Sequence, residues 1–202
     1  MSESRIIRTP DENWKAILEY LPGVLDEYER ICEGKDVAYW YNERAVLSML
    51  VACIWKAQGF ALEEYSAKRT GGQGRVDLWL RLRRKEYLVE AKMGYPAKLD
   101  GARDGIIWHL DQAREQVLSI VEQDPMTRLS LCFVIPAPTR RRKQDPEELF
   151  YSIADDFILE ETLSLLLTYC SPRSTWRNLP DGRTTKRFCP GLIVVGRVEE
   201  YR

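Results

Sequence analysis

Two acidic side chains and one lysine stand in two short apolar runs that are close together in the chain. A turn centred between Arg83 and Arg84 would pair these runs as antiparallel strands, with Asp77 opposite Glu90. Opposed residues share a face of the sheet with Cβ atoms ~5 Å apart. Lys92 lies two residues beyond Glu90 and therefore points to the same face. The spacing predicts two carboxylates and an ammonium group in one small patch.

Such a patch suits a divalent cation. Two adjacent carboxylates repel each other, and apolar neighbours make them costly unless a positive charge lies between them. Carboxylate oxygens favour Mg²⁺ or Mn²⁺, which keep several waters and bind substrate phosphate. A lysine beside the ion can position or deprotonate an attacking water, or stabilise charge on the phosphate. The alternative is a surface salt bridge among the three side chains, because Asp followed by Glu-x-Lys also occurs by chance.

The same residues resemble the PD-(D/E)XK nuclease superfamily, in which a hydrophobic strand bearing Asp precedes a strand bearing Glu-x-Lys. Gly-Arg-Val-Asp-Leu-Trp-Leu, around Asp77, and Tyr-Leu-Val-Glu-Ala-Lys, around Glu90, carry the resemblance, which covers about 41–135. In the branch that resembles the RecB-type nucleases, the helix after the hairpin carries Gln-x-x-x-Tyr. Gln112 matches this glutamine, whose implied role is to orient the lysine or contact substrate, whereas Gln116 replaces the tyrosine. A polar helix face is the alternative for Gln112.

The resemblance implies a role for each of the other matching positions. Asp77 and Glu90 would ligate Mg²⁺ or Mn²⁺, together with the backbone carbonyl of Ala91. Lys92 would serve the nucleophilic water. In that superfamily a helix before the hairpin often contributes a glutamate, and Glu43 would be an accessory ligand or would order a metal-bound water. The alternative for Glu43 is an acidic residue that merely favours the first turn of a helix.

The periodicity of apolar residues predicts how these positions are held. The expected elements are, in order, helices over 11–21, 24–32 and 41–58, strands over 60–67, 76–82 and 87–92, a helix from 104 or 110 to 122, a strand over 129–135, a helix over 146–169 and a strand over 192–198. A hairpin followed by helix-separated strands indicates a mixed sheet with helices on its faces. Strand alternation places Val76 on the same face as Leu78, and the buried look of the 41–58 helix predicts contacts on several of its sides.

We therefore expect one α/β domain over residues 1–202, with a restriction-endonuclease-like core. Residues 1–40 would form a helical N-terminal extension, 41–135 the core motif region, and 136–202 a C-terminal helix, loop and strand. The stretch 171–190, rich in Pro, Arg and Thr, is expected to be a loop.

Composition excludes several other classes of protein. The 202 residues are 45% hydrophobic and 30% charged, a soluble globular balance without an apolar run of the ~18 residues that a membrane span needs. The N-terminus lacks an apolar secretion signal. Five cysteines show no zinc-ligand spacing, and a single histidine argues against a His-based zinc site or a Ser-His-Asp hydrolase. We expect a cytoplasmic protein with free thiols and no membrane partner.

Charge is nearly balanced overall but clustered locally. The net charge is −1, with basic clusters at 81–85, 139–143 and 183–187. Solvated loops often carry such runs, but clusters beside a metal site also suit phosphate. The residues expected to contact a nucleic-acid backbone are Arg83, Arg84, Lys85, Arg140, Arg141 and Arg142. Binding through them would depend strongly on salt concentration.

These observations predict a metal-dependent nuclease that hydrolyses phosphodiester bonds, of DNA rather than RNA, by in-line attack of water. One alternative is a nuclease-fold module that no longer cuts and binds nucleic acid or a protein partner. Another is an α/β structural protein with an incidental salt bridge. Whether two chains pair as a homodimer to cut both strands is left open.

Overall fold

The protein is described by a computed structural model that covers residues 6–121, 125–138, 145–158, 160–171, 176–178 and 186–199. Its elements are β1 (Ile6–Arg8), α1 (Glu12–Ile31), a short 3₁₀ helix η1 (Ala38–Trp40), α2 (Glu43–Lys56), β2 (Phe60–Arg69), β3 (Gly72–Leu82), β4 (Lys85–Gly94), α3 (Ala102–Leu118), β5 (Thr127–Val134), α4 (Pro146–Ile158), β6 (Leu165–Cys170), β7 (Trp176–Asn178), β8 (Lys186–Phe188) and β9 (Gly191–Glu199). None of the described helices is long and apolar enough to cross a membrane.

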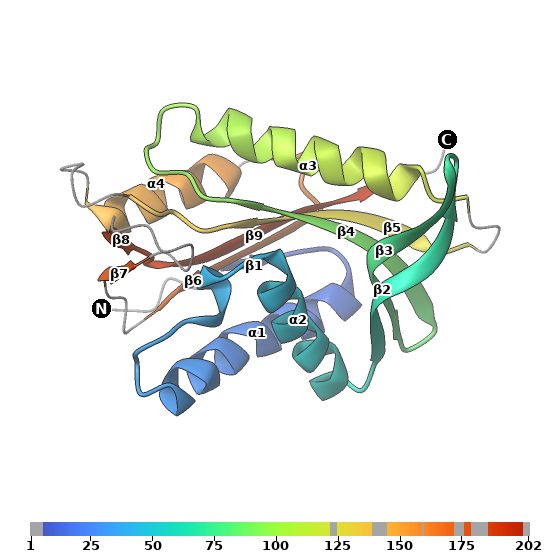
Figure 1. The fold of residues 1–202 in the computed structure, drawn as a ribbon, viewed down its shortest axis with the longest axis horizontal. Helices are drawn as coiled ribbons and strands as arrows, with labels where there is room; N and C mark the ends of the chain where they lie inside the picture. The colour runs from blue at the N-terminus through green and yellow to red at the C-terminus, as the bar shows by residue number, and fades with distance from the viewer. Residues whose placement is uncertain are drawn as a thin grey trace.

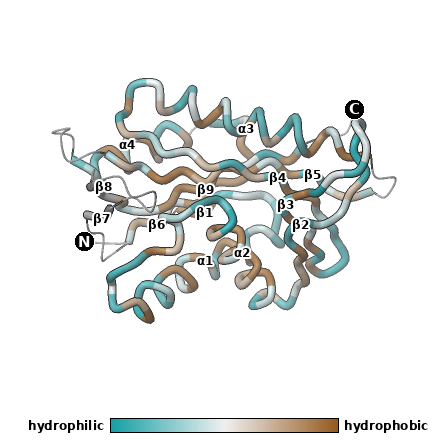
Figure 2. The backbone as a smooth tube through the Cα atoms, viewed as in Figure 1, coloured by the Kyte–Doolittle hydropathy of each residue, from teal (hydrophilic) through white to brown (hydrophobic). Residues whose placement is uncertain are grey.

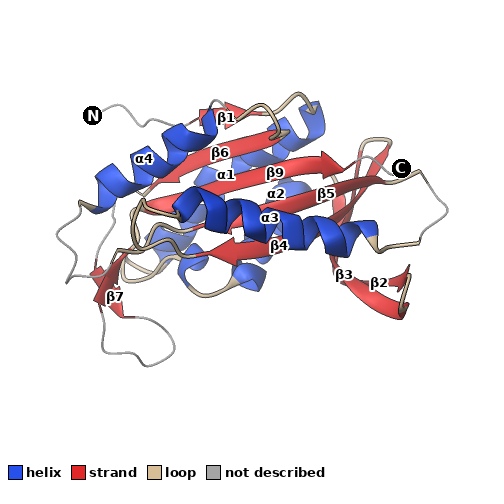
Figure 3. Cartoon of the chain, turned by 90° about the horizontal axis from the view of Figure 1, so that it is seen from above, coloured by secondary structure: helices blue, strands red, loops and turns tan. Residues whose placement is uncertain are grey.

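Seven strands form one mixed sheet in the order β1-β6-β9-β5-β4-β3-β2. β4 and β5 run parallel, and the other neighbouring pairs in this sheet are antiparallel. Helices α1 and α2 cover one face, and α3 and α4 cover the other (Figure 1). Seen from above, α3 lies along β4 and β5 (Figure 3). The predicted α/β class with a mixed, helix-flanked sheet is confirmed.

Two large apolar cores and a third, small cluster at the end of α3 hold these layers together. The larger core joins α1 and α2 to the sheet, and the other packs α3 and α4 against the opposite face. Figure 2 shows hydrophobic residues along the central strands and hydrophilic ones on the outer turns of α3. Helix α2 buries one face only, since Trp55 is 52% exposed. The prediction that α2 is buried on several sides is therefore wrong.

Helix α1 is continuous where the sequence predicts two helices. Asp11 caps it as expected, because its carboxylate accepts hydrogen bonds from the amides of Asn13 (2.9 Å) and Trp14 (3.2 Å). The predicted break at Pro22 is wrong. A buried stripe passes through this position from Leu18 to Leu25, and its packing offsets the ~3 kcal/mol that an internal proline costs a helix. The N-terminal segment also supplies the edge strand β1 and part of the larger core.

The predicted helix over 146–169 is also wrong in its second half. Helix α4 ends at Ile158, and the chain returns as strand β6. Leu165 and Leu167 pack in one core and Leu166 in the other. A strand that is apolar on both faces shows no two-residue alternation, so its sequence cannot be distinguished from a buried helix by periodicity. Within the expected loop 171–190, the described parts include the small hairpin β7–β8, and residues 172–175 and 179–185 lie outside the described residues.

Candidate functional site

The β3–β4 hairpin has the predicted register up to the proposed site. Trp79 lies opposite Leu88, and the last pair of the ladder is Leu78 with Val89. Arg83 and Arg84 form a two-residue turn between the strands, and Arg83 has a positive φ of 57°. Where Asp77 would next pair with Glu90, the regular ladder stops.

At this point the side chain of Asp77, in place of its backbone, bonds to β4. Its Oδ2 accepts a hydrogen bond from the Ala91 backbone N–H at 2.9 Å. The partner strand β2 is distorted beside it, because Glu64 adopts a φ of 54° and drops out of the β2–β3 ladder together with Asp77. A residue of positive φ inside a strand bends it and redirects neighbouring side chains. Val76 accordingly packs under α3 while Leu78 packs in the larger core, so their predicted common face is wrong.

Glu90 is the most deeply buried of the predicted acidic residues, with 2% of its surface exposed. Its Oε1 is held in an ion pair by the guanidinium of Arg69. The same guanidinium donates hydrogen bonds to the backbone oxygen of Gln116 (2.7 Å) and the hydroxyl of Ser119 (2.9 Å) at the end of α3. A Cβ atom on Gly74 would lie 2.7 Å from the Arg69 Cδ, so this glycine leaves the path of the arginine clear.

Arg69 could not be identified as a site residue from the sequence. A buried carboxylate requires a counter-charge, but the chain has 30 lysines and arginines, and nothing local to Glu90 identifies the one that reaches it.

Burial and like charge perturb two of the carboxylates. Burial, and then the charge of Asp77, raise the pKa of Glu90 to about 8, against the opposing effect of Arg69. Burial and Asp77 likewise raise the pKa of Glu43 to about 7, against the charges of Lys92 and Arg44. Glu43 is the first residue of α2. The structure thus brings predicted residues from three elements, α2, β3 and β4, within electrostatic reach of one another.

Lys92 is half-buried at the same site, and its ammonium is already engaged. Nζ donates a hydrogen bond to the carbonyl oxygen of Ala91 at 2.9 Å. That oxygen is the backbone atom expected to ligate a metal. The charge of Lys92 also acts on His109 of α3, since burial and then Lys92 lower the pKa of the imidazole.

The donor set suits a hard divalent cation in its chemistry, but not in its present arrangement. Three carboxylates that include a like-charge pair supply the oxygen ligands that Mg²⁺ and Mn²⁺ prefer. Among the described residues, however, no group of three or more His, Cys, Asp or Glu side chains is placed to hold a metal ion. A cation at this position would compete with Arg69 for Glu90 and with Lys92 for the Ala91 oxygen.

The other predicted residues are not brought to this centre. Gln112 is half-buried on α3, and none of the hydrogen bonds of the described residues joins it to Lys92. Arg83 and Arg84 lie in the hairpin turn, and Arg83 is six residues, or about 20 Å of strand, from Asp77. Lys85 pairs with Asp11 at 2.6 Å. The predicted contacts at Arg140, Arg141 and Arg142 lie outside the described residues.

A different pair of arginines flanks the site instead. Arg44 follows Glu43, and Arg75 precedes Asp77 by two residues. Both guanidiniums contact the carboxylate of Glu64, at 2.6 Å and 3.2 Å, while their side chains remain 71% exposed. Each arginine stands apart from the basic clusters of the sequence, so only the folded arrangement shows that the two converge.

A comparison with known protein families, with curated proteins and with solved structures found no match to this chain.

Proposed function

We propose that the protein is a metal-dependent nuclease that hydrolyses phosphodiester bonds of nucleic acid, DNA in preference to RNA. The observation that carries this proposal is the buried Glu90, whose pKa is raised by burial and by Asp77, beside a lysine and a second raised glutamate. Acidic residues with strongly perturbed pKa values, grouped around a positively charged side chain, are typical of functional sites. A fold that needed only stability would gain nothing from burying Glu90 next to Asp77.

The proposed fold is a restriction-endonuclease-like core of the PD-(D/E)XK type. Support comes from the order α2, β2, β3, β4, α3, β5, which follows the αβββαβ order of that core. A location in the cytoplasm is part of the same proposal, supported by five described cysteines that are all free thiols.

Each residue has a role in this proposal. Mg²⁺ or Mn²⁺, held by Asp77, Glu90 and the Ala91 carbonyl, would polarise the phosphate and acidify a water. Asp77 also fixes the Ala91 backbone through its hydrogen bond to the amide. Lys92 orients the attacking water and stabilises negative charge on the phosphate. Glu43, at the first turn of α2, would be an accessory ligand or would order a metal-bound water.

The test is incubation of the purified chain with linear, circular and single-stranded DNA and with RNA, in Mg²⁺, Mn²⁺ or chelator. We expect products only with a metal. Asp77→Asn and Lys92→Met should each lower the rate by about 10²–10⁴-fold, whereas Glu86→Gln, at the far end of β4, should cut like the parent. An Asp77→Asn protein that cuts at the parent rate would refute the assignment.

A second candidate function is a nuclease-fold module that binds nucleic acid or a protein without cutting. It is favoured by one observation: Arg69 already forms an ion pair with Glu90, and Lys92 already donates a hydrogen bond to the Ala91 oxygen. In that case DNA would bind without products, and Mg²⁺ would leave the melting temperature of the protein unchanged.

A further inference from the structure

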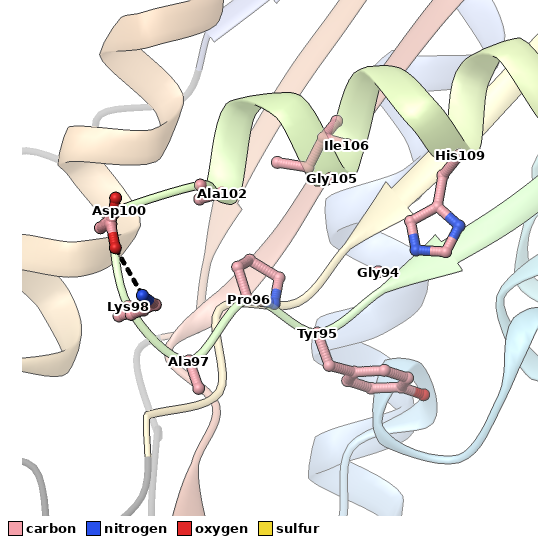
Figure 4. Close-up of a pocket in the computed structure, with 11 residues that line it drawn as sticks. Gly94, Tyr95, Pro96, Ala97, Lys98, Asp100, Ala102, Gly105, Ile106 and His109 are labelled. Atoms are coloured by element: carbon pink, nitrogen blue, oxygen red, sulfur yellow. Dashed lines mark hydrogen bonds and ion pairs between the residues drawn. The ribbon is translucent and has the colours of Figure 1, made fainter.

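A cavity of about 330 Å³ opens where β4 ends and α3 begins. Figure 4 shows the residues around it, with the His109 ring above Gly94 and Tyr95 and the Lys98–Asp100 ion pair at the other side. Its volume lies at the lower end of the ~300–1,000 Å³ typical of small-molecule sites. The cavity therefore has room for one small ligand.

The cavity lies directly beyond the proposed catalytic residues. Glu90, Lys92 and Gly94 occupy alternate positions of β4, so they follow one another on the face that α3 covers, about 6.6 Å apart. A Cβ atom on Gly94 would lie 3.3 Å from the His109 ring. The strand thus presents a carboxylate, then an ammonium, then bare backbone that borders the cavity. A part of the substrate that lies beyond a phosphate at Lys92, in the direction of Gly94, would therefore enter the cavity.

The chemistry of the walls is mixed in the way that a nucleobase requires. Ile106 is buried and, with Pro96, gives an apolar surface. The imidazole of His109 has no hydrogen-bond partner among the described residues, so its ring nitrogens are available to a ligand. Trp108 is 58% exposed and lies outside the cavity lining, packed edge-on against His109 with ring centroids 5.0 Å apart. Tyr95 and His109 are aromatic residues of the lining itself. Aromatic side chains of this kind stack on unpaired bases.

We propose that this cavity takes the base of the nucleotide next to the scissile phosphate. A base inside a duplex is stacked and paired, and it enters a pocket only after leaving the stack. The preferred substrate is then a single strand, a frayed end or a junction, rather than continuous duplex. This inference rests on the proposed nuclease function.

The single histidine of the chain makes the proposal directly measurable. Its imidazole Cε1–H gives one unambiguous NMR signal, which can be followed in the full chain with Mg²⁺ while dAMP is added. This nucleotide contains no phosphodiester bond to cut. We expect dAMP to shift the His109 signal well beyond the shift that the same concentration of inorganic phosphate causes through Lys92.

Gly105→Leu tests whether the cavity itself binds the base. Gly105 lines the cavity, and a Cβ atom there meets nothing within 4 Å, so leucine fills the space without a clash. The matched control is Gly23→Leu, an equally open glycine of α1. Leucine has the higher helix propensity, so both variants should fold. Gly105→Leu should weaken dAMP binding roughly tenfold or more and lose the preference for single strands, whereas Gly23→Leu should match the parent.

The outcomes separate this proposal from the proposed function. The base site is overturned, even if the chain cuts DNA, when millimolar dAMP does not shift the His109 signal. It is also overturned when the Gly105→Leu protein binds dAMP like the parent. Conversely, dAMP binding that Gly105→Leu abolishes, in a chain that cuts nothing, supports the base site and overturns the nuclease.

Discussion

Replacing Glu90 with glutamine should stabilise the metal-free protein at high pH. The pKa of Glu90 is raised from the usual 4.5 to about 8, by burial first and by Asp77 second. The folded state therefore holds a proton that the unfolded state releases. This stabilisation is fully present below about pH 4.5 and is lost as the pH rises through 8. Glutamine resembles the protonated acid and keeps its neutral form at every pH.

The two pKa values set the size of the effect. A pKa of about 8 in the folded chain against 4.5 in the unfolded one corresponds to at most about 5 kcal/mol, at ~1.36 kcal/mol for each tenfold change. That ceiling already includes the ion pair with Arg69, which lowers the pKa of Glu90. The glutamine amide is a weaker partner for this guanidinium than a carboxyl group, which reduces the gain. The guanidinium keeps its bonds to the Gln116 oxygen and the Ser119 hydroxyl. We therefore expect a net gain of about 2 kcal/mol at pH 9, within a total stability of about 5–15 kcal/mol.

The assay is urea unfolding in chelator at pH 5, 7 and 9. The parent should lose stability as the pH rises, and Glu90→Gln should lose markedly less. Glu86→Gln is the control, because it removes one negative charge from the same strand while lying half-buried at the hairpin end, 3.5 Å from Arg81. Equal pH dependence in the parent and in Glu90→Gln would refute the reasoning, since Glu90 would then be ionised against Arg69 throughout.

Two further predictions concern substrate and metal. Glu64→Gln releases Arg44 and Arg75 and should tighten single-stranded DNA binding several-fold, whereas Arg75→Gln should weaken it and lower the salt slope by about 1. Fluorescence anisotropy at several salt concentrations measures both, and Arg84→Gln in the distant turn should change neither. Mg²⁺ at about a hundredfold above its Kd should raise the Tm by about 5 °C or more at pH 8 and by less at pH 6, because protons then compete for Glu90 and Glu43. Calorimetry of Asp77→Asn should show no such rise.

Local patterns explain which parts of the fold could be predicted. The β3–β4 register follows from alternation and a short turn, both visible within 76–92. Whether a helix continues past Pro22, and whether Leu166 lies in a helix or a strand, depends on partners far along the chain. Periodicity alone predicted both incorrectly.

The same distinction applies to the candidate site. Asp77, Glu90 and Lys92 could be placed near one another because the hairpin joins them. Arg69 and the Arg44–Glu64–Arg75 contacts could not, since they depend on a distorted strand and on the end of α3.

The backbone of Ala91 links the three central residues. Its N–H is bound by Asp77, and its carbonyl accepts the Lys92 ammonium. Ala91 is fully buried between Glu90 and Lys92, so both bonds are made to the backbone of one buried residue. Under the proposed function, a cation on the Ala91 oxygen would repel the Lys92 ammonium, which is bonded to that same oxygen. Metal binding would then be coupled to the position of Lys92 through the Ala91 backbone, which Asp77 holds by its bond to the amide.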